Sequence, residues 1–561
     1  MKFRLSASLL LTAVTAVAQV SVLKPAAGMN GMVVSSDSLA TSVGVQIMKD
    51  GGNAVDAAVA VGFALAVTYP QAGNLGGGGY IVVHLANGEN HAIDARETAP
   101  SAAATALYLD SAGNPIPQRS LSGGLAAGVP GNVDGLILAE EKWGRLGLKK
   151  VIAPAVQYAA NGFVMGRRLA MDLAGNFLAM QKYPPTFRYF TRNGVPYRQG
   201  ELFRQPDLAE VLKKIGDHGR EGFYSGEIPA LIARADRNAG GVMTPDDLER
   251  YHARIAQPVT VLYRGYRVVA VPPSSSGGIC LAEILNTLSH FDLHSAGFGS
   301  SQSIHLEAEA LRRAFADRAR WLGDDAFTRI PLELLTSADY AAQLAAGIDT
   351  FRATPSRLIY PDLITPPPEG VHTTHYSVAD REGNAAAVTT TLNSYFGSLV
   401  AVDGAGFLLN NEMDDFSIKP GVPNQFGAIG SDANGIQPGK RMLSSMSPTI
   451  LLKEDKPFLI LGAPGGTTII CTVLQVILNI VDFDMPLVRA ELAGRIHQQW
   501  LPDEVLYEKG TISRDVLDHL SERGYRMTSR EYLGEVQTIL VTPEGFEGVA
   551  DPRGNGTAEG F

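Results

Sequence analysis

Runs of alternating and β-branched residues mark the strands that this chain is expected to form. Between residues 373 and 391, two threonine- and valine-rich arms flank the turn cluster 380–384, where Gly383 makes a positive φ inexpensive. This pattern predicts a β-hairpin. Its midpoint is residue 382, inside the turn, so Thr373 is expected to lie opposite Thr391.

The rest of the chain mixes helical and strand patterns. An Ala-rich apolar run at 53–67, capped by Asn53 and stopped by Pro70, predicts a buried helix. Residues 79–84 and 91–94 predict paired strands. Residues 130–360 are largely helical in pattern, and 301–322 is the clearest amphipathic stretch. Residues 467–478 predict another buried helix, and 505–508 and 538–542 predict late strands. The pattern indicates an α/β protein of stacked layers.

Composition narrows the class of protein. The chain has 561 residues, of which 45% are hydrophobic and 19% charged, so it can build a large core. Its net charge of −10 argues against a nucleic-acid partner. The two cysteines, Cys280 and Cys471, lie in apolar surroundings and are expected to be buried structural thiols.

The first residues have the pattern of a secretory signal. Lys2 and Arg4 precede an apolar run at 9–17, and Ala16 and Ala18 fit the small-x-small cleavage rule. The apolar run is shorter than the ~20 residues that a membrane anchor needs. We therefore expect a signal peptide at 1–18, a mature chain from Gln19, no membrane span and a periplasmic or secreted protein.

The segment before the hairpin suggests a cleavage site. Residues 365–372 contain three successive prolines, which neither continue a helix nor join a sheet interior. A cut between His372 and Thr373 would give pieces 19–372 and 373–561, and the freed α-amine of Thr373 could activate its own hydroxyl. By pattern alone, an ordinary Thr-rich hairpin remains the alternative.

The run from Thr373 to Asn393-Ser-Tyr-Phe396-Gly397 resembles the signature of the γ-glutamyltransferases, and the resemblance extends from Gly31 to Phe561. One departure is Ala386, where the family more often has Val. The resemblance implies the αββα sandwich of N-terminal-nucleophile hydrolases, built from two self-cleaved pieces that form a heterodimer. It also implies transfer of a γ-glutamyl group, for example from glutathione, to water, an amino acid or a peptide, without a cofactor.

A γ-glutamyl donor carries an α-carboxylate and an α-ammonium, and the resemblance implies residues for both. For the carboxylate these are Arg96, at a strand end, and the adjacent Ser444 and Ser445. By residue type alone, Arg96 could equally form a surface ion pair with Glu97, and the serines a Ser-turn.

For the ammonium, the implied residues are Asp415, Glu412 and Asn393. Glu412 stands where some family members have Gln, so this part of the pocket is expected to be more acidic. An N-cap role for Asp415 is the alternative.

The remaining implied residues serve the reaction itself. Gly465 and Gly466, between a strand and a helix, would stabilise an oxyanion through successive N–H groups, although a plain strand–helix turn has the same pattern. Thr391 would orient the Thr373 hydroxyl. Residues 420–427 resemble a lid loop in which Phe426 replaces a frequent Tyr; a surface loop is the alternative.

Searches for other chemistry are negative. The sequence has no Gly-x-Ser-x-Gly elbow, no His-Glu-x-x-His, no phosphate loop and no metal-ligand spacing. Two other functions remain open. One is a related acylase for glutaryl or cephalosporin-type substrates, which lack the α-ammonium; the other is a periplasmic γ-glutamyl-peptide-binding protein with an inactive nucleophile.

Overall fold

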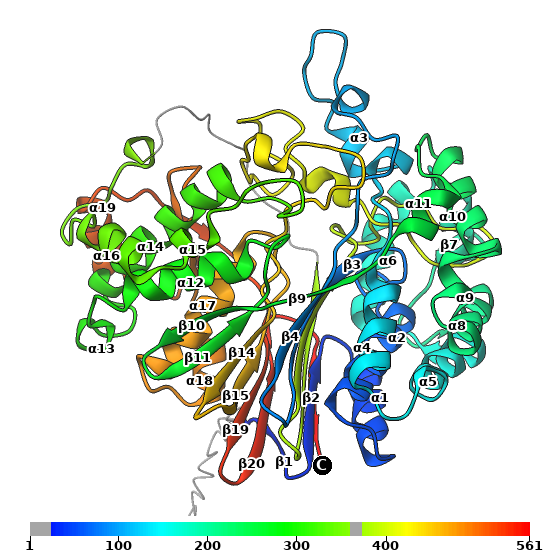
Figure 1. The fold of residues 1–561 in the computed structure, drawn as a ribbon, viewed down its shortest axis with the longest axis horizontal. Helices are drawn as coiled ribbons and strands as arrows, with labels where there is room; N and C mark the ends of the chain where they lie inside the picture. The colour runs from blue at the N-terminus through cyan, green and yellow to red at the C-terminus, as the bar shows by residue number, and fades with distance from the viewer. Residues whose placement is uncertain (1–23, 360–372) are drawn as a thin grey trace, which may run out of the picture.

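The computed structural model describes residues 24–359 and 373–561. Two seven-stranded sheets, antiparallel throughout, are stacked face to face at the centre of the molecule, with helices on both outer sides (Figure 1). This is the layered α/β arrangement that the sequence predicts. The predicted signal peptide 1–18 and the residue His372, on one side of the predicted cleavage site, lie outside the described residues.

The first sheet has the order β1 (Ala26–Gly28), β20 (Gly545–Ala550), β19 (Gln537–Thr542), β15 (Lys456–Leu461), β14 (Thr449–Lys453), β11 (Tyr266–Ala270) and β10 (Val259–Tyr263). The second has the order β21 (Thr557–Gly560), β2 (Gly31–Ser35), β12 (Thr374–Asp380), β13 (Ala385–Thr391), β3 (Gly78–His84), β4 (Asn90–Ala95) and β9 (Arg254–Ala256). Smaller sheets join β16 (Ile496–His497), β17 (Val505–Glu508) and β18 (Met527–Arg530), then β5 (Phe163–Val164) with β8 (Leu202–Phe203), and β6 (Thr191–Arg192) with β7 (Val195–Pro196).

Each large sheet has its own helical layer. The second sheet is covered by α1 (Ser38–Lys49), α2 (Ala54–Thr68) and α4 (Asn132–Trp143), with α5 (Leu148–Asn161), α6 (Arg167–Met180), α7 (Pro184–Phe190), α8 (Pro206–His218), α9 (Glu221–Tyr224), α10 (Glu227–Asn238) and α11 (Pro245–Arg250) further out. On the side of the first sheet lie α12 (Gly277–Leu288), α13 (Leu293–Ala296), α14 (Ser301–Trp321), α15 (Leu332–Leu335), α16 (Ala338–Ala346), α17 (Thr468–Val481), α18 (Leu487–Leu492) and α19 (Arg514–Glu522).

The predicted elements form for the expected local reasons. Asn53 caps α2 through a capping box with Asp56, and every residue of that helix is buried. The hairpin β12–β13 pairs Thr374 with Thr390, so the register places Thr373 opposite Thr391 as predicted. In the turn, Gly383 has a φ of 96°, which a residue with a Cβ adopts only under strain.

The prediction that the helix at 301–322 is amphipathic was wrong. The sequence of α14 has the pattern of an amphipathic helix, yet every residue from Ser303 to Ala319 is buried. Its charges are accommodated in buried ion pairs, such as Glu309 with Arg313 at 2.6 Å. This helix therefore brings arginines into the interior, which affects the functional site.

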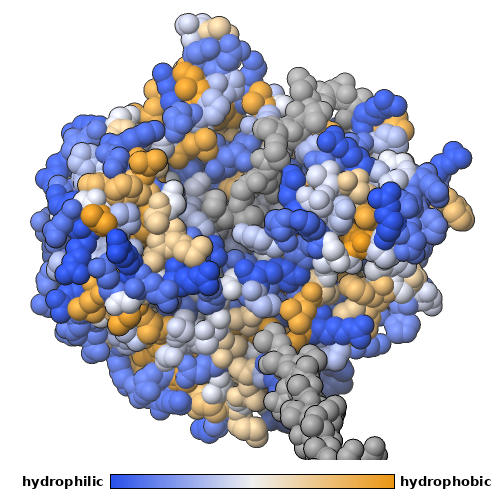
Figure 2. Space-filling model, turned by 180° about the vertical axis from the view of Figure 1, so that it is seen from behind, coloured by the Kyte–Doolittle hydropathy of each residue, from blue (hydrophilic) through white to orange (hydrophobic). Residues whose placement is uncertain are grey.

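The surface seen from behind is mostly hydrophilic, with apolar side chains in small separate groups (Figure 2). Among the residues that the structure describes, no helix combines the length and apolarity needed to cross a membrane. Both cysteines are buried, as predicted.

Candidate active site

The proposed nucleophile lies where two central strands of the second sheet end. Thr373 immediately precedes β12 and Thr391 ends β13, so both hydroxyls reach the same small pocket, where their oxygens are 3.4 Å apart. The Thr391 hydroxyl also accepts a hydrogen bond of 2.7 Å from the Asn393 N–H. The chain bends sharply there, because Asn393 has a φ of 74°. The hairpin thus fixes the relative position of the two hydroxyls.

The second group of predicted residues surrounds Arg96, which follows β4. The Arg96 guanidinium pairs with Glu412 at 2.6 Å and with Asp415 at 2.5 Å, and its Nε donates to the Met442 carbonyl. Asn393 joins this group through its side-chain amide, 3.5 Å from Asp415. Arg96 also contacts Glu97 at 3.4 Å, but both side chains are fully buried, so a surface ion pair is wrong.

Three carboxylates around one guanidinium make this part of the pocket acidic. Burial raises the pKa of Glu412 well above the usual range, against the opposing charge of Arg96. Burial likewise raises the pKa of Glu97 to about 8. Burial alone would disfavour the charge of Arg96, yet the three carboxylates raise its pKa well above the usual value. The predicted carboxylate clamp and the predicted ammonium acceptors are therefore in direct contact.

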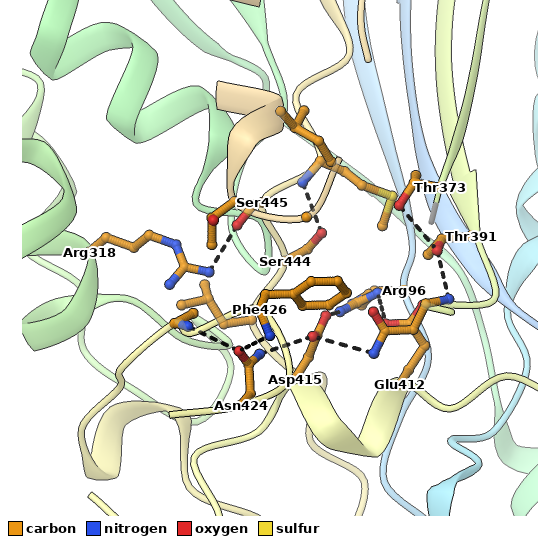
Figure 3. A pocket seen from close by; sticks show the side chains of 17 residues that line it. Arg96, Arg318, Thr373, Thr391, Glu412, Asp415, Asn424, Phe426, Ser444 and Ser445 are labelled. Atoms are coloured by element: carbon orange, nitrogen blue, oxygen red, sulfur yellow. Dashed lines mark hydrogen bonds and ion pairs between the residues drawn. The ribbon is translucent and has the colours of Figure 1, made fainter. Parts of the chain in front are cut away.

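The predicted serines lie between this acidic group and a second cation (Figure 3). Ser444 and Ser445 precede β14 and line the pocket. The Ser444 hydroxyl oxygen accepts from the Met446 N–H at 3.0 Å. The Ser445 hydroxyl oxygen accepts from Arg318 Nη2 at 3.0 Å. Both hydroxyl oxygens are thus held by fixed donors.

The predicted oxyanion loop joins β15 to α17. Gly465 and Gly466 have φ values of 143° and 56°, in the region that favours glycine. Gly466 and Thr467 line the pocket and Gly465 does not, so the structure places only Gly466 of the predicted pair at the pocket wall. A Cβ on Gly466 would lie 2.8 Å from the Phe426 ring. The lid loop is therefore closed over the glycine.

The lid is also tied to the acidic group. Asn424 donates to Asp415 at 3.3 Å, and its amide oxygen accepts from the N–H groups of Phe426 and Ala428. Phe426 is buried, which makes the surface-loop alternative wrong for this residue.

Three polar pocket residues escape the sequence analysis, namely Arg318, Asn424 and Thr467. Asn424 lies inside the lid run and Thr467 directly after the predicted glycines, so proximity to those motifs could have indicated both. Arg318 comes from α14 and has no comparable signal. Within residues 24–359 and 373–561, no cluster of three or more His, Cys, Asp or Glu side chains is placed to hold a metal ion.

The stacked antiparallel sheets between helices, with a threonine opening a central strand, define an N-terminal-nucleophile hydrolase fold. The structure is similar to that of a cephalosporin acylase from Bacillus halodurans, with a TM-score of 0.84 and 27% identity over 98% of this chain and 99% of that chain.

The chain belongs to the gamma-glutamyltranspeptidase family, whose sequence model matches residues 40–561. It is 46% identical to the glutathione hydrolase proenzyme of Escherichia coli (strain K12) over 95% of this chain and 92% of that protein. It is also similar to the gamma-glutamyltranspeptidase of Helicobacter pylori, with a TM-score of 0.58 and 42% identity over 60% of this chain and 96% of that chain.

Proposed function

We propose that this protein is a self-cleaving γ-glutamyltransferase and glutathione hydrolase whose nucleophile is Thr373. The observation that carries the proposal is the position of Thr373, at a pocket that has hydroxyl and guanidinium groups for a carboxylate beside carboxylates for an ammonium. The names of its relatives support the same activity, since the similar Escherichia coli protein is a glutathione hydrolase proenzyme.

Maturation uses the same hydroxyl as catalysis. The Thr373 oxygen attacks the carbonyl carbon of His372, and the peptide nitrogen leaves as the α-amine of Thr373. Water then hydrolyses the ester, giving residues 19–372 with a new carboxylate and residues 373–561 with a free amine, which stay together as a heterodimer. The signal-like residues 1–18 are removed earlier, during export to the periplasm or the outside of the cell.

Catalysis transfers the acyl group in two steps. The α-amine of Thr373 accepts the hydroxyl proton as the oxygen attacks the γ-carbonyl carbon of the donor, and the oxyanion faces the backbone at Gly466. The tetrahedral intermediate expels the donor's amine, which takes the proton and leaves a γ-glutamyl ester on Thr373. Water, an amino acid or a peptide then attacks the ester and restores the hydroxyl, so no cofactor is needed.

The acidic group favours γ-glutamyl over glutaryl substrates. A glutaryl group has no ammonium, so it would not use the carboxylates of Glu412 and Asp415 that lie beside Arg96 in the pocket. The acylase alternative also has the more distant match, at 35% identity to the acylase ACY 1 proenzyme of Pseudomonas sp. (strain SE83) against 46% to the Escherichia coli hydrolase.

Intact mass and N-terminal sequencing of the purified protein test the proposal, together with hydrolysis of matched γ-glutamyl and glutaryl 4-nitroanilides. We expect two pieces, one beginning at Thr373, and a preference for the γ-glutamyl compound. Thr373→Ala is expected to stay uncut and inactive, whereas Thr373→Ser keeps a hydroxyl and is expected to be cut. A single, uncut wild-type chain that binds glutamate would support the binding-protein alternative instead.

A further inference from the structure

The segment 161–204 is basic, although the protein as a whole is acidic. It contains seven Lys or Arg and two Asp or Glu, a net charge of +5, whereas the whole chain has a net charge of −10. The segment includes β5, α6, α7, β6, β7 and β8, in the helical layer on the side of the second sheet. Positive charge is therefore concentrated in one part of an otherwise acidic molecule.

Helix α6 exposes an apolar face to solvent. Met171 and Leu178 are 57% and 75% exposed. Ala174 and Gly175 between them are also exposed, and at 3.6 residues per turn these four positions share one face of the helix. The opposite face packs into the protein through Leu169, Leu173 and Met180. The helix is thus apolar on two faces, and the fold covers only one of them.

The small sheets beside α6 extend this exposed surface. Val164 in β5 pairs with Leu202 in β8, and the two side chains are 66% and 45% exposed. Val164 and Arg167, at the start of α6, line the same surface cavity, so β5 lies beside the exposed face of the helix. Val195 in β7 is 51% exposed, and β7 contacts α6. We call this surface, with its neighbouring basic residues, the α6 surface.

The basic residues of the α6 surface include several that no acid neutralises. Arg188 pairs with Asp403, and Arg192 pairs with Glu201 at 3.5 Å. Four other basic side chains are exposed and form no ion pair with any residue that the structure describes: Arg167, Lys182, Arg198 and Arg204. Arg167 lies one turn before Met171, on the same exposed face of α6. Unpaired positive charges thus surround the apolar side chains.

This combination is typical of proteins that lie on a membrane surface. Lys and Arg attract anionic headgroups, while apolar side chains of the same face enter the boundary between headgroups and acyl chains. A soluble anionic polymer would use the charges but would leave the apolar side chains exposed. A second copy bound through the same surface would bring two positive surfaces together, which is unfavourable.

We propose that the α6 surface binds the protein peripherally to a membrane that contains anionic lipids. Helix α6 would lie in the plane of the headgroups, with Met171 and Leu178 directed toward the acyl chains. The acidic remainder of the chain is repelled by the same lipids, so the charge distribution also sets the orientation of the protein. None of these residues lines the active-site pocket, and the inference therefore does not depend on the proposed activity.

Sedimentation of the purified protein with lipid vesicles tests this proposal. One set of vesicles is equimolar phosphatidylcholine and phosphatidylglycerol, and the other is phosphatidylcholine alone. Two double variants divide the α6 surface by chemistry. Met171→Ser with Leu178→Ser removes apolar side chains, and Arg167→Gln with Lys182→Gln removes charges.

Two further double variants are matched controls on other elements. Leu262→Ser with Leu334→Ser removes apolar side chains that are 68% and 49% exposed in β10 and α15. Lys456→Gln with Arg489→Gln removes two exposed positive charges in β15 and α18. Figure 1 shows β10, α15 and α18 on the far side of the two sheets from α6. Hydrolysis of a γ-glutamyl 4-nitroanilide in solution should be the same for all variants, which verifies their folding.

Wild type should bind the vesicles with phosphatidylglycerol and not those of phosphatidylcholine alone. Each variant of the α6 surface should weaken binding about 10-fold or more, whereas both controls should resemble wild type. Sodium chloride at about 0.5 M should abolish binding, because it screens the attraction to the headgroups.

The absence of binding to the anionic vesicles, or equal binding by wild type and both α6-surface variants, would overturn the proposal. Loss in the charge variant alone would also overturn it, because the apolar side chains would then not enter the lipid. Sedimentation velocity tests the other occupant. A wild-type dimer that Met171→Ser with Leu178→Ser dissociates would assign the surface to a second copy of the chain instead.

Discussion

The hydroxyl oxygens of Thr373 and Thr391 face each other across the first pair of the hairpin, 3.4 Å apart. This distance is longer than an ordinary O–H···O hydrogen bond, and such contacts often tighten only when the reacting complex forms. The Thr391 oxygen is held by the Asn393 N–H, so it presents a fixed acceptor to the nucleophile.

Thr391→Val should therefore slow both self-cleavage and turnover. Valine keeps the shape and the β propensity but offers no acceptor, so the Thr373 hydroxyl loses its orientation. We expect kcat to fall about 100-fold, a loss typical of a misplaced reacting group. Thr391→Ser keeps the acceptor and is the matched control. Gel electrophoresis of samples quenched at successive times measures self-cleavage, and steady-state kinetics measure turnover. Equal rates for Thr391→Val and Thr391→Ser would contradict the prediction.

The hairpin could be predicted because all of its information is local: the turn residues, the β-branched arms and the count of residues set its register. The pocket is different. Arg96 forms ion pairs with Glu412 and Asp415, which lie more than three hundred residues away in the sequence. No spacing rule predicts that the arginine expected to bind a carboxylate pairs with the two acids expected to bind an ammonium. Arg318 was missed for a related reason. Its helix was interpreted as amphipathic, and only the packing of α14 inside the molecule turns a surface-type arginine into a pocket residue.

The lid loop gives a second prediction. The Phe426 ring packs against Gly466 and has no hydroxyl with which to bond the pocket rim. Phe426→Tyr should add such a bond, retain the acyl-enzyme longer behind the lid and raise the share of transfer to a dipeptide acceptor over hydrolysis. Phe426→Ala should open the pocket and shift the ratio toward hydrolysis. The ratio of free glutamate to dipeptide product measures this, and an identical ratio in all three proteins would show that the lid does not control access of water.

Glu412 should make donor binding depend on pH. Burial raises its pKa well above that of an ordinary glutamate, so this carboxyl keeps its proton to a higher pH than an exposed glutamate does. The donor's ammonium favours the ionised carboxylate, so binding lowers the pKa of Glu412 and releases a proton. Affinity must then increase, and KM must fall, as the pH rises through the pKa of Glu412.

Glu412→Gln removes this titration. Glutamine is neutral at every pH, as protonated Glu412 is, so the variant should resemble wild type at the acidic end and bind the donor more weakly at the alkaline end. Its KM profile should be flatter. If Glu412 were ionised throughout, wild type would itself have a flat profile and the variant would be weaker at every pH. Initial rates over a series of pH values in buffers of constant ionic strength distinguish the two cases.

His497 should determine part of the acid sensitivity of the fold. Its Nε2 lies 3.0 Å from the Gln499 amide oxygen, which also accepts from the pocket residue Thr467 at 2.5 Å. Its Nδ1 lies 3.1 Å from the Cys471 sulfur. A neutral ring with the proton on Nε2 donates to Gln499, and its Nδ1 can accept from the thiol, whose hydrogen can otherwise be donated to the Thr468 carbonyl at 3.0 Å. The ring thereby connects the start of α17 to the loop behind the oxyanion site.

Burial lowers the pKa of His497 to about 4, with the Gln499 bond opposing the shift. Because the folded pKa is depressed, the unfolded chain binds more protons between about pH 4 and 6.5. The neutral ring thus contributes stability that is fully present above about pH 6.5 and is lost as pH falls to about 4, up to about 3 kcal/mol.

His497→Asn can make both hydrogen bonds but does not titrate. Its thermal midpoint should therefore fall less than that of wild type as pH decreases through this interval. His290→Asn, at an exposed position, should follow wild type. Parallel curves for wild type and His497→Asn would mean that the ring is not held neutral, and its proposed link to the oxyanion loop would lose its basis.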